Sequence, residues 1–247
     1  MLTFFKTKPV LKELIPDNHV DIHSHLLWGI DDGARTFGDT LRLTKALQNF
    51  GISQLITTPH IIEYVWDNSR DTITAKETET QTELQKNQIT IPFRAAAEYM
   101  MNDHFVQLFK TEELLTLKDN YVLVEMSYVN PPIQLYSILF DLQLAGYIPV
   151  LAHPERYLFY HQNLEEYEKL KRAGCLFQLN LLSTVGYYGD GIAKIAEKLL
   201  QKGMYSFVGS DVHHDNHVAA FDQKVKYKDL TPLKEAIAHN QFFRMEE

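Results

Sequence analysis

His23 and His25 alternate at the end of the apolar run Val20-Asp21-Ile22, and Asp31 and Asp32 follow in the next loop. Side chains on an extended chain repeat with period two, so both imidazoles are expected on the same side of a strand. Two imidazoles with carboxylates close behind are typical ligands of a divalent metal ion. The H-x-H pattern alone is short and permissive, and it also arises by chance on protein surfaces.

Polar residues able to bind a metal follow most of the other segments that have strand character. They are His60, Glu98, Glu125, His153, Asp211 and His213, and Asn180 follows a further such segment. The carboxyl ends of parallel strands meet at one edge of an α/β fold, where these proteins gather their chemistry. One buried carboxylate or imidazole could be a satisfied core residue, but its recurrence at nearly every strand favours a shared metal site.

The types of these side chains limit the metal. Neutral imidazole and carboxylate oxygen without thiolate suit manganese, iron or zinc, whereas calcium prefers oxygen alone. The candidates outnumber the needs of one ion, so we predict two or three ions. Closely spaced ions can bring the pKa of a shared water toward neutrality and so provide a nucleophile without serine or cysteine. Arg156, three residues after His153, is placed to bind a phosphate, with a salt bridge to Glu155 or another carboxylate as the alternative.

Segments of strand and helix character alternate along the chain. Strands are predicted at 20–23, 54–58, 91–98, 121–125, 148–152, 175–180 and 205–209. The clearest helices are predicted at 37–50 with Thr36 as N-cap, 69–88, 133–145, 163–172 with Asn163 as N-cap, 192–202, and from Thr231 onward. This alternation with short links indicates a parallel sheet and one α/β domain. Seven βα units are compatible with a closed or distorted barrel and with an open doubly wound sheet.

The bulk composition is that of a globular protein, since 45% of the 247 residues are apolar and 23% are charged. The formal net charge is −8 and no run of Lys or Arg occurs, so a nucleic-acid partner is disfavoured. The single Cys175 lies in an apolar run, is predicted to be a buried thiol, and fits a reducing, cytoplasmic location. No apolar run approaches the roughly 18 residues that span a bilayer, so no transmembrane segment is expected.

These motifs together resemble the polymerase-and-histidinol-phosphatase (PHP) superfamily of metal-dependent phosphoesterases. The chain is more closely similar to the bacterial protein-tyrosine phosphatases of capsule and exopolysaccharide biosynthesis. The matching stretches are DIHSH (21–25), GIDDG (29–33), TPH (58–60), AEY (97–99), VE (124–125), AHPERY (152–157) and GSDVH (209–213). They run in family order over most of the chain, and they are specific as a set although no single one is.

The resemblance implies a fold, a set of ions and a set of functional residues. The implied fold is a distorted (β/α)7 TIM-like barrel, the PHP fold, in a single domain over 1–247 with 1–19 as an N-terminal extension. The implied ligand sets, ion by ion, are His23, His25, Glu98 and Asp211; Glu98, Glu125 and His153; and Asp32, His60 and His213. Family spacing selects Asp32 over Asp31, and manganese is the expected metal, with iron or zinc as alternatives. The implied catalytic residues are Arg156, Asp211 and His213.

The function implied by the resemblance is a metal-dependent protein-tyrosine phosphatase. Its expected substrate is the tail of a tyrosine kinase that controls polysaccharide export. A small-molecule phosphatase of the histidinol-phosphatase type and a catalytically silent metal-binding interaction module are the alternatives. Trp28, where the family often has proline, and Asn102, where an acidic residue is common, depart from the pattern and bear on substrate fit. Tyr128, Tyr187 and Tyr188 are candidates to stack on a tyrosine ring, with burial in the core as the alternative.

Overall fold

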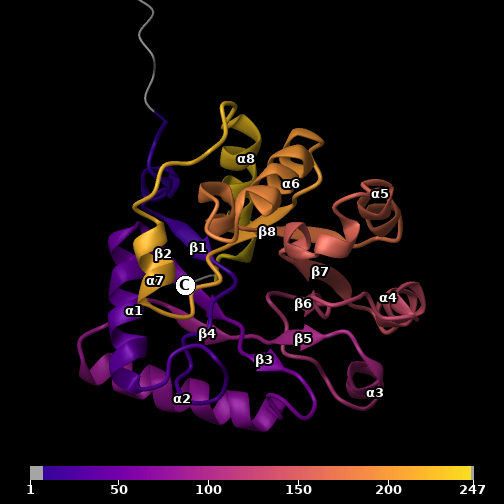
Figure 1. Cartoon of the computed structure of the whole chain (residues 1–247). Helices are drawn as coiled ribbons and strands as arrows, with labels where there is room; N and C mark the ends of the chain where they lie inside the picture. Colours follow the sequence, from indigo (N-terminus) through magenta and orange to yellow (C-terminus); the bar gives the residue numbers. More distant parts are fainter. Residues whose placement is uncertain (1–7, 246–247) are drawn as a thin grey trace, which may run out of the picture.

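The computed structural model describes residues 8–245, so residues 1–7 of the predicted N-terminal extension and residues 246–247 lie outside the described residues. The named strands form two parallel sheets with helices around them (Figure 1). The three-stranded sheet has the order β1 (His19–Asp21), β2 (Ile52–Thr57) and β4 (Phe93–Ala95). The six-stranded sheet has the order β3 (His60–Ile61), β5 (Glu98–Met100), β6 (Tyr121–Glu125), β7 (Ile148–Ala152), β8 (Leu176–Asn180) and β9 (Phe207–Gly209).

Two short breaks divide the strands between these sheets. Pro59, which lacks a backbone N–H, lies between β2 and β3. Two alanines lie between β4 and β5, so the prediction of one continuous strand over 91–98 is wrong. Backbone hydrogen bonds cross both breaks, from the Ala96 N–H to the Thr57 carbonyl (2.8 Å) and from the Glu98 N–H to the Pro59 carbonyl (3.1 Å). The paired segments therefore continue side by side through the bend.

The chain beyond β1 is also joined to the chain beyond β9. The Asp211 N–H donates to the His23 carbonyl (2.7 Å), and the His25 N–H donates to the Val212 carbonyl (2.9 Å). These bonds bring the first and last strands together at their carboxyl ends. Two segments near opposite ends of the sequence, each carrying candidate metal ligands, thereby become neighbours.

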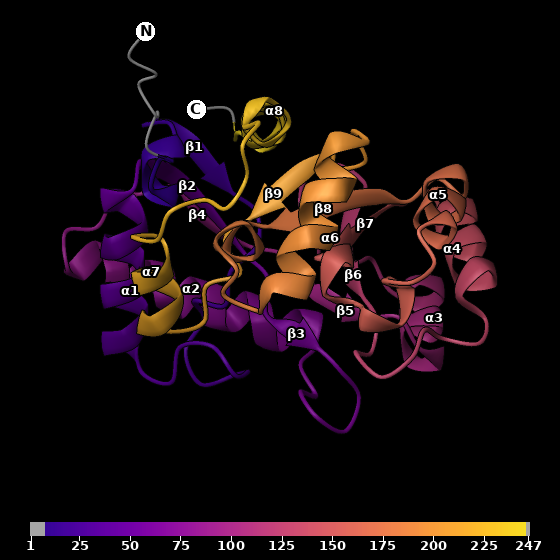
Figure 2. The ribbon, with the colours of Figure 1, turned by 45° about the horizontal axis from the view of Figure 1, so that its top comes forward.

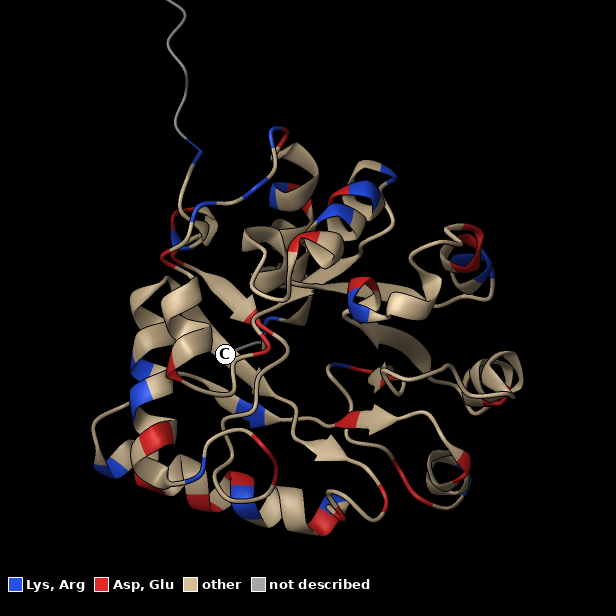
Figure 3. Cartoon of the chain, viewed as in Figure 1, with Lys and Arg blue, Asp and Glu red and all other residues tan. Residues whose placement is uncertain are grey.

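Helices lie outside the sheets (Figures 1 and 2). Those beside the three-stranded sheet are α1 (Phe37–Asn49), α2 (Arg70–Lys86) and α7 (Asp215–Ala220). Those that follow strands of the six-stranded sheet are α3 (Asp103–Thr111), α4 (Leu135–Leu144), α5 (Glu165–Arg172), α6 (Asp190–Gln201) and α8 (Thr231–His239). Lys and Arg are mixed with Asp and Glu along α1, α2, α5 and α6 (Figure 3), as expected for solvated outer faces.

The helix ends show which local predictions succeed. The predicted N-cap of α1 is confirmed, because Thr36 Oγ1 accepts from the Asp39 N–H (3.3 Å) and the Asp39 carboxylate accepts from the Thr36 N–H (2.9 Å). The prediction that Asn163 is the N-cap of the helix ending at Arg172 is wrong, because this helix, α5, begins after Leu164 and has no side-chain cap hydrogen bond. Asn102, which departs from the family pattern, caps α3 by accepting a hydrogen bond from its first turn.

The core confirms the prediction for Cys175 and includes part of the N-terminal extension. Cys175 is buried, and burial raises the pKa of its thiol to about 12. Leu11 and Ile15 are buried in the same cluster as Leu233 and Ile237 of α8. Within residues 8–245, no helix combines the length and apolar character that crossing a membrane requires.

Candidate metal centre

The nine side chains predicted as ligands lie close together, in overlapping groups at the carboxyl ends of the strands. Glu125 ends β6 and His153 follows β7 directly, and four more lie two to four residues beyond β1 or β9, namely His23, His25, Asp211 and His213. His60 and Glu98 begin β3 and β5 instead of ending strands, because the breaks described above divide the predicted segments in two. Asp32 lies in the loop after β1. The fold therefore brings together residues from nearly every strand.

Two of these residues have a strained backbone. His153 has φ 37° and Asp211 has φ 52°, in the left-handed region that non-glycine residues rarely adopt. Each such residue costs on the order of 1–3 kcal/mol and persists only where its surroundings hold it in place. Backbone strain at two neighbouring polar residues is typical of a functional site.

The first group consists of His23, His25 and Asp211, with Glu98 beside them. His23 Nε2 lies 3.2 Å from Glu98 Oε2 and 3.2 Å from Asp211 Oδ1. His25 Nε2 lies 3.4 Å and 3.5 Å from the same two oxygens. Two imidazole nitrogens and two carboxylate oxygens thus converge on one buried point.

Glu98 lies at the centre of the site and connects the remaining groups. Its Oε1 lies 3.1 Å from His153 Nε2, and its Oε2 lies 3.3 Å from His60 Nδ1. His60 Nδ1 also lies 2.9 Å from Glu125 Oε1. The donor atoms form two overlapping groups, His23–Glu98–His153 and His60–Glu98–Glu125, so Glu125 and His153 meet through Glu98.

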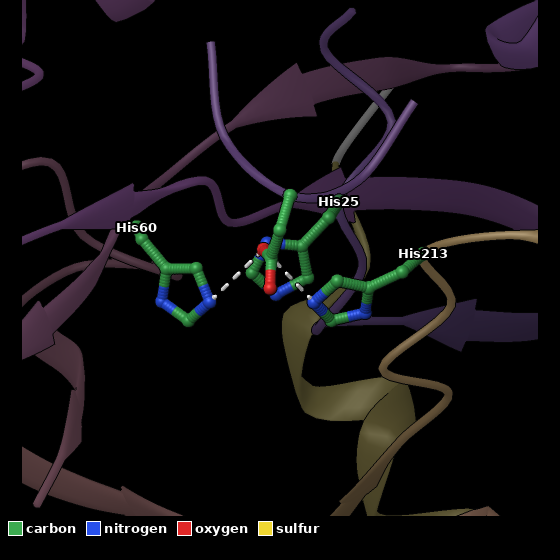
Figure 4. Close-up of side chains that lie close together, drawn as sticks. His25, His60 and His213 are labelled. Carbon is green, nitrogen blue, oxygen red and sulfur yellow. Dashed lines mark ion pairs between the residues drawn. The ribbon is translucent and has the colours of Figure 1, made fainter. Parts of the chain in front are cut away.

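Asp32 joins the last group from the half-exposed side of the site. Its Oδ1 lies 3.5 Å from His60 Nε2 and 3.4 Å from His213 Nε2. Figure 4 shows His60 and His213 facing the same carboxylate from opposite sides, with His25 behind it. The His25 ring stacks on that of His213 at 3.9 Å between centroids. This group opens toward solvent, whereas the other groups are buried.

The arrangement of two buried atoms fits a bound cation. His60 Nδ1 and Glu125 Oε1 lie 2.9 Å apart, and among residues 8–245 neither atom forms a hydrogen bond with any other group. Buried polar atoms are almost always paired, because leaving them unpaired costs free energy. Imidazole and carboxylate donors are a normal ligand set for manganese, iron and zinc, so a divalent ion would satisfy both atoms.

Hydrogen bonds behind the first group orient its imidazoles. His23 Nδ1 donates to Gln178 Oε1 (2.9 Å), and His25 Nδ1 donates to Asp31 Oδ2 (2.7 Å). Donation from Nδ1 leaves the Nε2 lone pair directed into the cluster, as in proteins that bind metals through histidine. Asp31, which the family spacing disfavours as a metal ligand, instead accepts the hydrogen bond that orients His25. Gln178 was missed, because only the folded chain brings it to His23.

The loop over 26–33 is fixed on both sides. A Cβ on Gly33 would lie 2.2 Å from the His25 carbonyl oxygen, so only glycine fits where the loop passes against the strand end. Trp28 packs edge-on against Phe37 at 5.2 Å, and Lys76 Nζ lies 4.4 Å from its ring centroid. Trp28 thus anchors the loop to α1 and α2.

The charges of the cluster shift the pKa values of its members. Burial opposes protonation of His23, but the carboxylates of Glu98 and Asp211 raise its pKa to about 10. Burial also opposes protonation of His60, and Glu125 is the main group that raises its pKa, to about 9. Against the effect of burial, the histidines hold the pKa of Glu98 and of Asp211 well below their usual range. Protons on the imidazoles thus take the place that cations would otherwise occupy among these carboxylates.

Arg156 lies between two tyrosine rings at the edge of the site. Its guanidinium carbon is 4.2 Å from the centroid of Tyr188 and 4.8 Å from that of Tyr128. Its Nη1 donates to Asp211 Oδ2 (2.9 Å), whereas the neighbouring Glu155 is buried and bonded elsewhere. The two nearby rings stabilise the cation, and its bond to Asp211 helps to orient its N–H groups.

A cavity of about 210 Å³ opens above these groups. Its lining consists of Asp32, His60, Glu98, Tyr128, His153, Arg156, Tyr188, Asp211, His213, His214 and His217. Of the three tyrosines considered for stacking on a substrate, Tyr128 and Tyr188 line this cavity. Tyr187 packs behind it, with its ring 5.0 Å from that of His217.

Histidines and carboxylates gathered at the carboxyl ends of parallel strands, with a fixed arginine beside them, define a metal-binding α/β protein. Residues 19–225 match the family described as "Capsular polysaccharide synthesis, CpsB/CapC". The chain belongs to this family.

Two related proteins match this chain in sequence over most of its length. The CapC protein of Staphylococcus aureus is 28% identical over 195 residues, which cover 78% of this chain and 76% of that protein. The tyrosine-protein phosphatase YwqE of Bacillus subtilis (strain 168) is 30% identical over 196 residues, which cover 79% of this chain and 77% of that protein.

The chain is also similar in structure to a solved protein of known fold. That structure belongs to a set of crystal structures of YwqE from Bacillus subtilis and CpsB from Streptococcus pneumoniae, described as metal-dependent tyrosine phosphatases. It superimposes with a TM-score of 0.76 at 29% sequence identity, covering 82% of this chain and 84% of that chain. The similarity thus extends to the arrangement of the whole fold.

Proposed function

We propose that this protein is a metal-dependent protein-tyrosine phosphatase that acts in capsular polysaccharide synthesis. One observation carries the proposal: nine histidine and carboxylate side chains form overlapping groups beside Arg156, which is stacked between two tyrosines. The names of its relatives YwqE and CpsB support the same activity here. The substrate we infer is a phosphotyrosine-bearing protein, namely the C-terminal tail of a bacterial tyrosine kinase.

We infer that the site holds three divalent ions, with manganese preferred over iron and zinc. The ligand sets are His23, His25, Glu98 and Asp211; Glu98, Glu125 and His153; and Asp32, His60 and His213. The donor atoms of His23, His25 and Asp211 converge, as do those of Asp32, His60 and His213, and Glu98 joins both the group that contains His153 and the group that contains Glu125; this convergence supports the assignment. When bound, such ions lower the pKa of water and stabilise negative charge on a phosphoryl group.

Hydrolysis adds water to phosphorus and breaks the bond to the tyrosine oxygen, which leaves with a proton. Arg156 binds the phosphate through N–H groups that its contact with Asp211 does not use. Asp211 orients that guanidinium at 2.9 Å. His213 Nδ1 donates to the Asp211 carbonyl (2.9 Å), which directs its Nε2 toward the cavity. Arg156, Asp211 and His213 are therefore our proposed catalytic residues.

The shape of the cavity supports a preference for tyrosine phosphate. Six of the candidate ligands, His23, His25, Glu98, Glu125, His153 and Asp211, are buried, and Tyr128 and Tyr188 line the cavity that leads to them. A phosphate on tyrosine reaches farther from its backbone than one on serine, so it can enter such a recess while its chain stays outside. The two tyrosine rings provide apolar surface against which the substrate ring can pack.

We further infer that the two sheets form a distorted (β/α)7 barrel within one domain over 1–247, with 1–19 as its N-terminal extension. Hydrogen bonds across the breaks and between the ends of β1 and β9 support a closed arrangement. Burial of Leu11 in a core shared with Ile237 supports a single domain. The buried, free thiol of Cys175 supports a cytoplasmic location.

The test is a comparison of three substrates with purified protein and added Mn²⁺. A phosphotyrosine peptide should be hydrolysed faster than the matched phosphoserine peptide and faster than histidinol phosphate. Faster turnover of histidinol phosphate would favour a small-molecule phosphatase. Bound metal with no turnover of any substrate would favour a silent binding module.

A variant pair tests the assignment of the site. His153→Ala should abolish hydrolysis and lower the metal content, because it removes a donor 3.1 Å from the central Glu98. His161→Ala serves as the matched control, since His161 follows the same strand but its ring Nε2 lies 2.8 Å from the Glu155 carbonyl oxygen, outside the ligand cluster. Full activity of His153→Ala would contradict the proposed site.

A further inference from the structure

A second cavity lies beside the metal centre, and the proposed activity does not use it. It has a volume of about 370 Å³ and lies between the end of β5, the start of α3 and the loop over 127–134. Apolar atoms come from Met100, Met101, Ile133 and Ile138, and amide groups from asparagine and glutamine side chains. Among its lining residues that the structure describes, only Asp103 is charged.

This cavity adjoins the metal centre through the backbone of β5 and β6. Met100 pairs in register with Glu125, and the Met101 N–H donates to the Glu125 carbonyl (2.9 Å). Two residues beyond Glu125, Ser127 lines the second cavity, whereas the next residue, Tyr128, lines the metal cavity. A wall one residue thick therefore separates the two cavities, and both open at the carboxyl ends of the strands.

The outer edge of this wall is unusually apolar. Val129 is 82% exposed and Ile133 is 102% exposed, next to the half-exposed ring of Tyr128. A large aliphatic side chain left fully in water is stabilised when a partner covers it. The Ser127 hydroxyl accepts a hydrogen bond from the Val129 N–H (3.2 Å), which fixes the turn that presents these side chains.

We propose that this cavity binds an apolar side chain of the substrate protein, two residues away from the phosphotyrosine. The inference rests on the proposed phosphatase function and adds a sequence preference to it. In an extended peptide, side chains two residues apart point the same way and lie about 7 Å apart. A peptide that crosses the wall can thus place its phosphotyrosine in one cavity and the second side chain in the other.

The chemistry of the lining selects the class of side chain. Methionine side chains adapt to apolar groups of different shapes, so leucine, isoleucine, methionine and phenylalanine all suit the cavity. An aspartate or glutamate at the same place would lose water and lie near the Asp103 carboxylate. The preferred substrate therefore has an apolar residue, and not an acidic one, two positions from its phosphotyrosine.

The test uses matched phosphotyrosine peptides with leucine, alanine or aspartate two positions away on either side, together with phosphotyrosine amide. The wild type should show a kcat/KM about tenfold higher for the better leucine peptide than for the aspartate peptide. Ile133→Asp should lower the ratio of kcat/KM between that leucine peptide and phosphotyrosine amide by about tenfold. Ile133 is fully exposed, so the variant removes no core contact.

Leu144→Asp is the matched control. Leu144 is also exposed and apolar, but it ends α4, six residues and roughly 9 Å along the helix from Ile138 of the cavity lining. Its substitution should leave the ratio unchanged. Equal hydrolysis of the leucine and aspartate peptides by the wild type, or equal ratios in the two variants, would overturn this inference alone. Failure to hydrolyse phosphotyrosine amide at all would instead overturn the phosphatase function, and this inference with it.

Discussion

Metal binding should release protons, because the imidazoles of the site are protonated when no cation is bound. The pKa of His23 is raised to about 10, that of His60 to about 9, and that of His25 well above its usual value. His23 and His60 therefore carry a proton at pH 7, and the pKa of His25 is shifted in the same direction, whereas a histidine that binds a metal must be neutral. We expect at least two protons to leave each chain as its ions bind.

The cost of this deprotonation follows from the same values. Each pH unit below a pKa costs about 1.4 kcal/mol, so at pH 7 neutralising His23 takes about 4 kcal/mol and His60 about 3 kcal/mol. The sign is clear, since raised pKa values favour the metal-free state as pH falls. Metal affinity should therefore rise with pH between 6 and 8, by about tenfold per pH unit for each proton displaced.

Calorimetric titration with Mn²⁺ in two buffers of different ionisation enthalpy measures the protons released. His60→Gln should lower the number by about one, because glutamine carries no titrating proton. The exposed His239, which lies outside the cluster, provides the control variant His239→Gln, with unchanged release. Release of fewer than one proton by the wild type would refute the electrostatic reasoning.

Three further changes test separate contacts. In Gly209→Ala the new Cβ would lie 2.6 Å from His23 Cβ and would displace this ligand, so the affinity for metal should fall at least tenfold. The metal content after dialysis measures this, and an unchanged content would contradict the tight packing. Tyr188→Leu should raise KM for phosphotyrosine by roughly fivefold through loss of the ring over Arg156, whereas Tyr188→Phe should not; equal effects would exclude stacking. Burial lowers the pKa of His19 to about 4, so the free energy of unfolding should fall as pH drops from 6.5 toward 4. Denaturant titration should show a shallower fall for His19→Gln, and an identical profile would exclude His19 as the cause.

Sequence patterns predict those structural features that depend on residues close together in the chain. The α1 cap depends on Thr36 and Asp39, which lie three positions apart, and both of its hydrogen bonds are present. The prediction of one strand over 91–98 is wrong because the three alanines at 95–97 contain no turn residue that would indicate the bend. Such a bend is set by the neighbouring strand, where Pro59 interrupts the ladder.

The site likewise contains residues that the sequence predicts and residues that only the folded chain reveals. Recurrence of metal-binding residues after strand segments predicted eight of the nine members, and the spacing in the similar family selected Asp32 over Asp31; the structure brings all nine together. Gln178 behind His23 and the two tyrosines around Arg156 come from distant parts of the chain, so no local spacing indicates them. Their roles depend on which strands become neighbours in the sheets, and the periodicity of the sequence does not determine the order of the strands.

The hydrogen bonds between the ends of β1 and β9 bear on when the protein can acquire its ions during synthesis. His23 and His25 leave the ribosome early, whereas Asp211 follows only after most of the chain has been made. A nascent chain therefore has no complete first group until the segment after β9, the last strand in the sequence, has been made. We expect this group of donor atoms to form only in a nearly full-length chain.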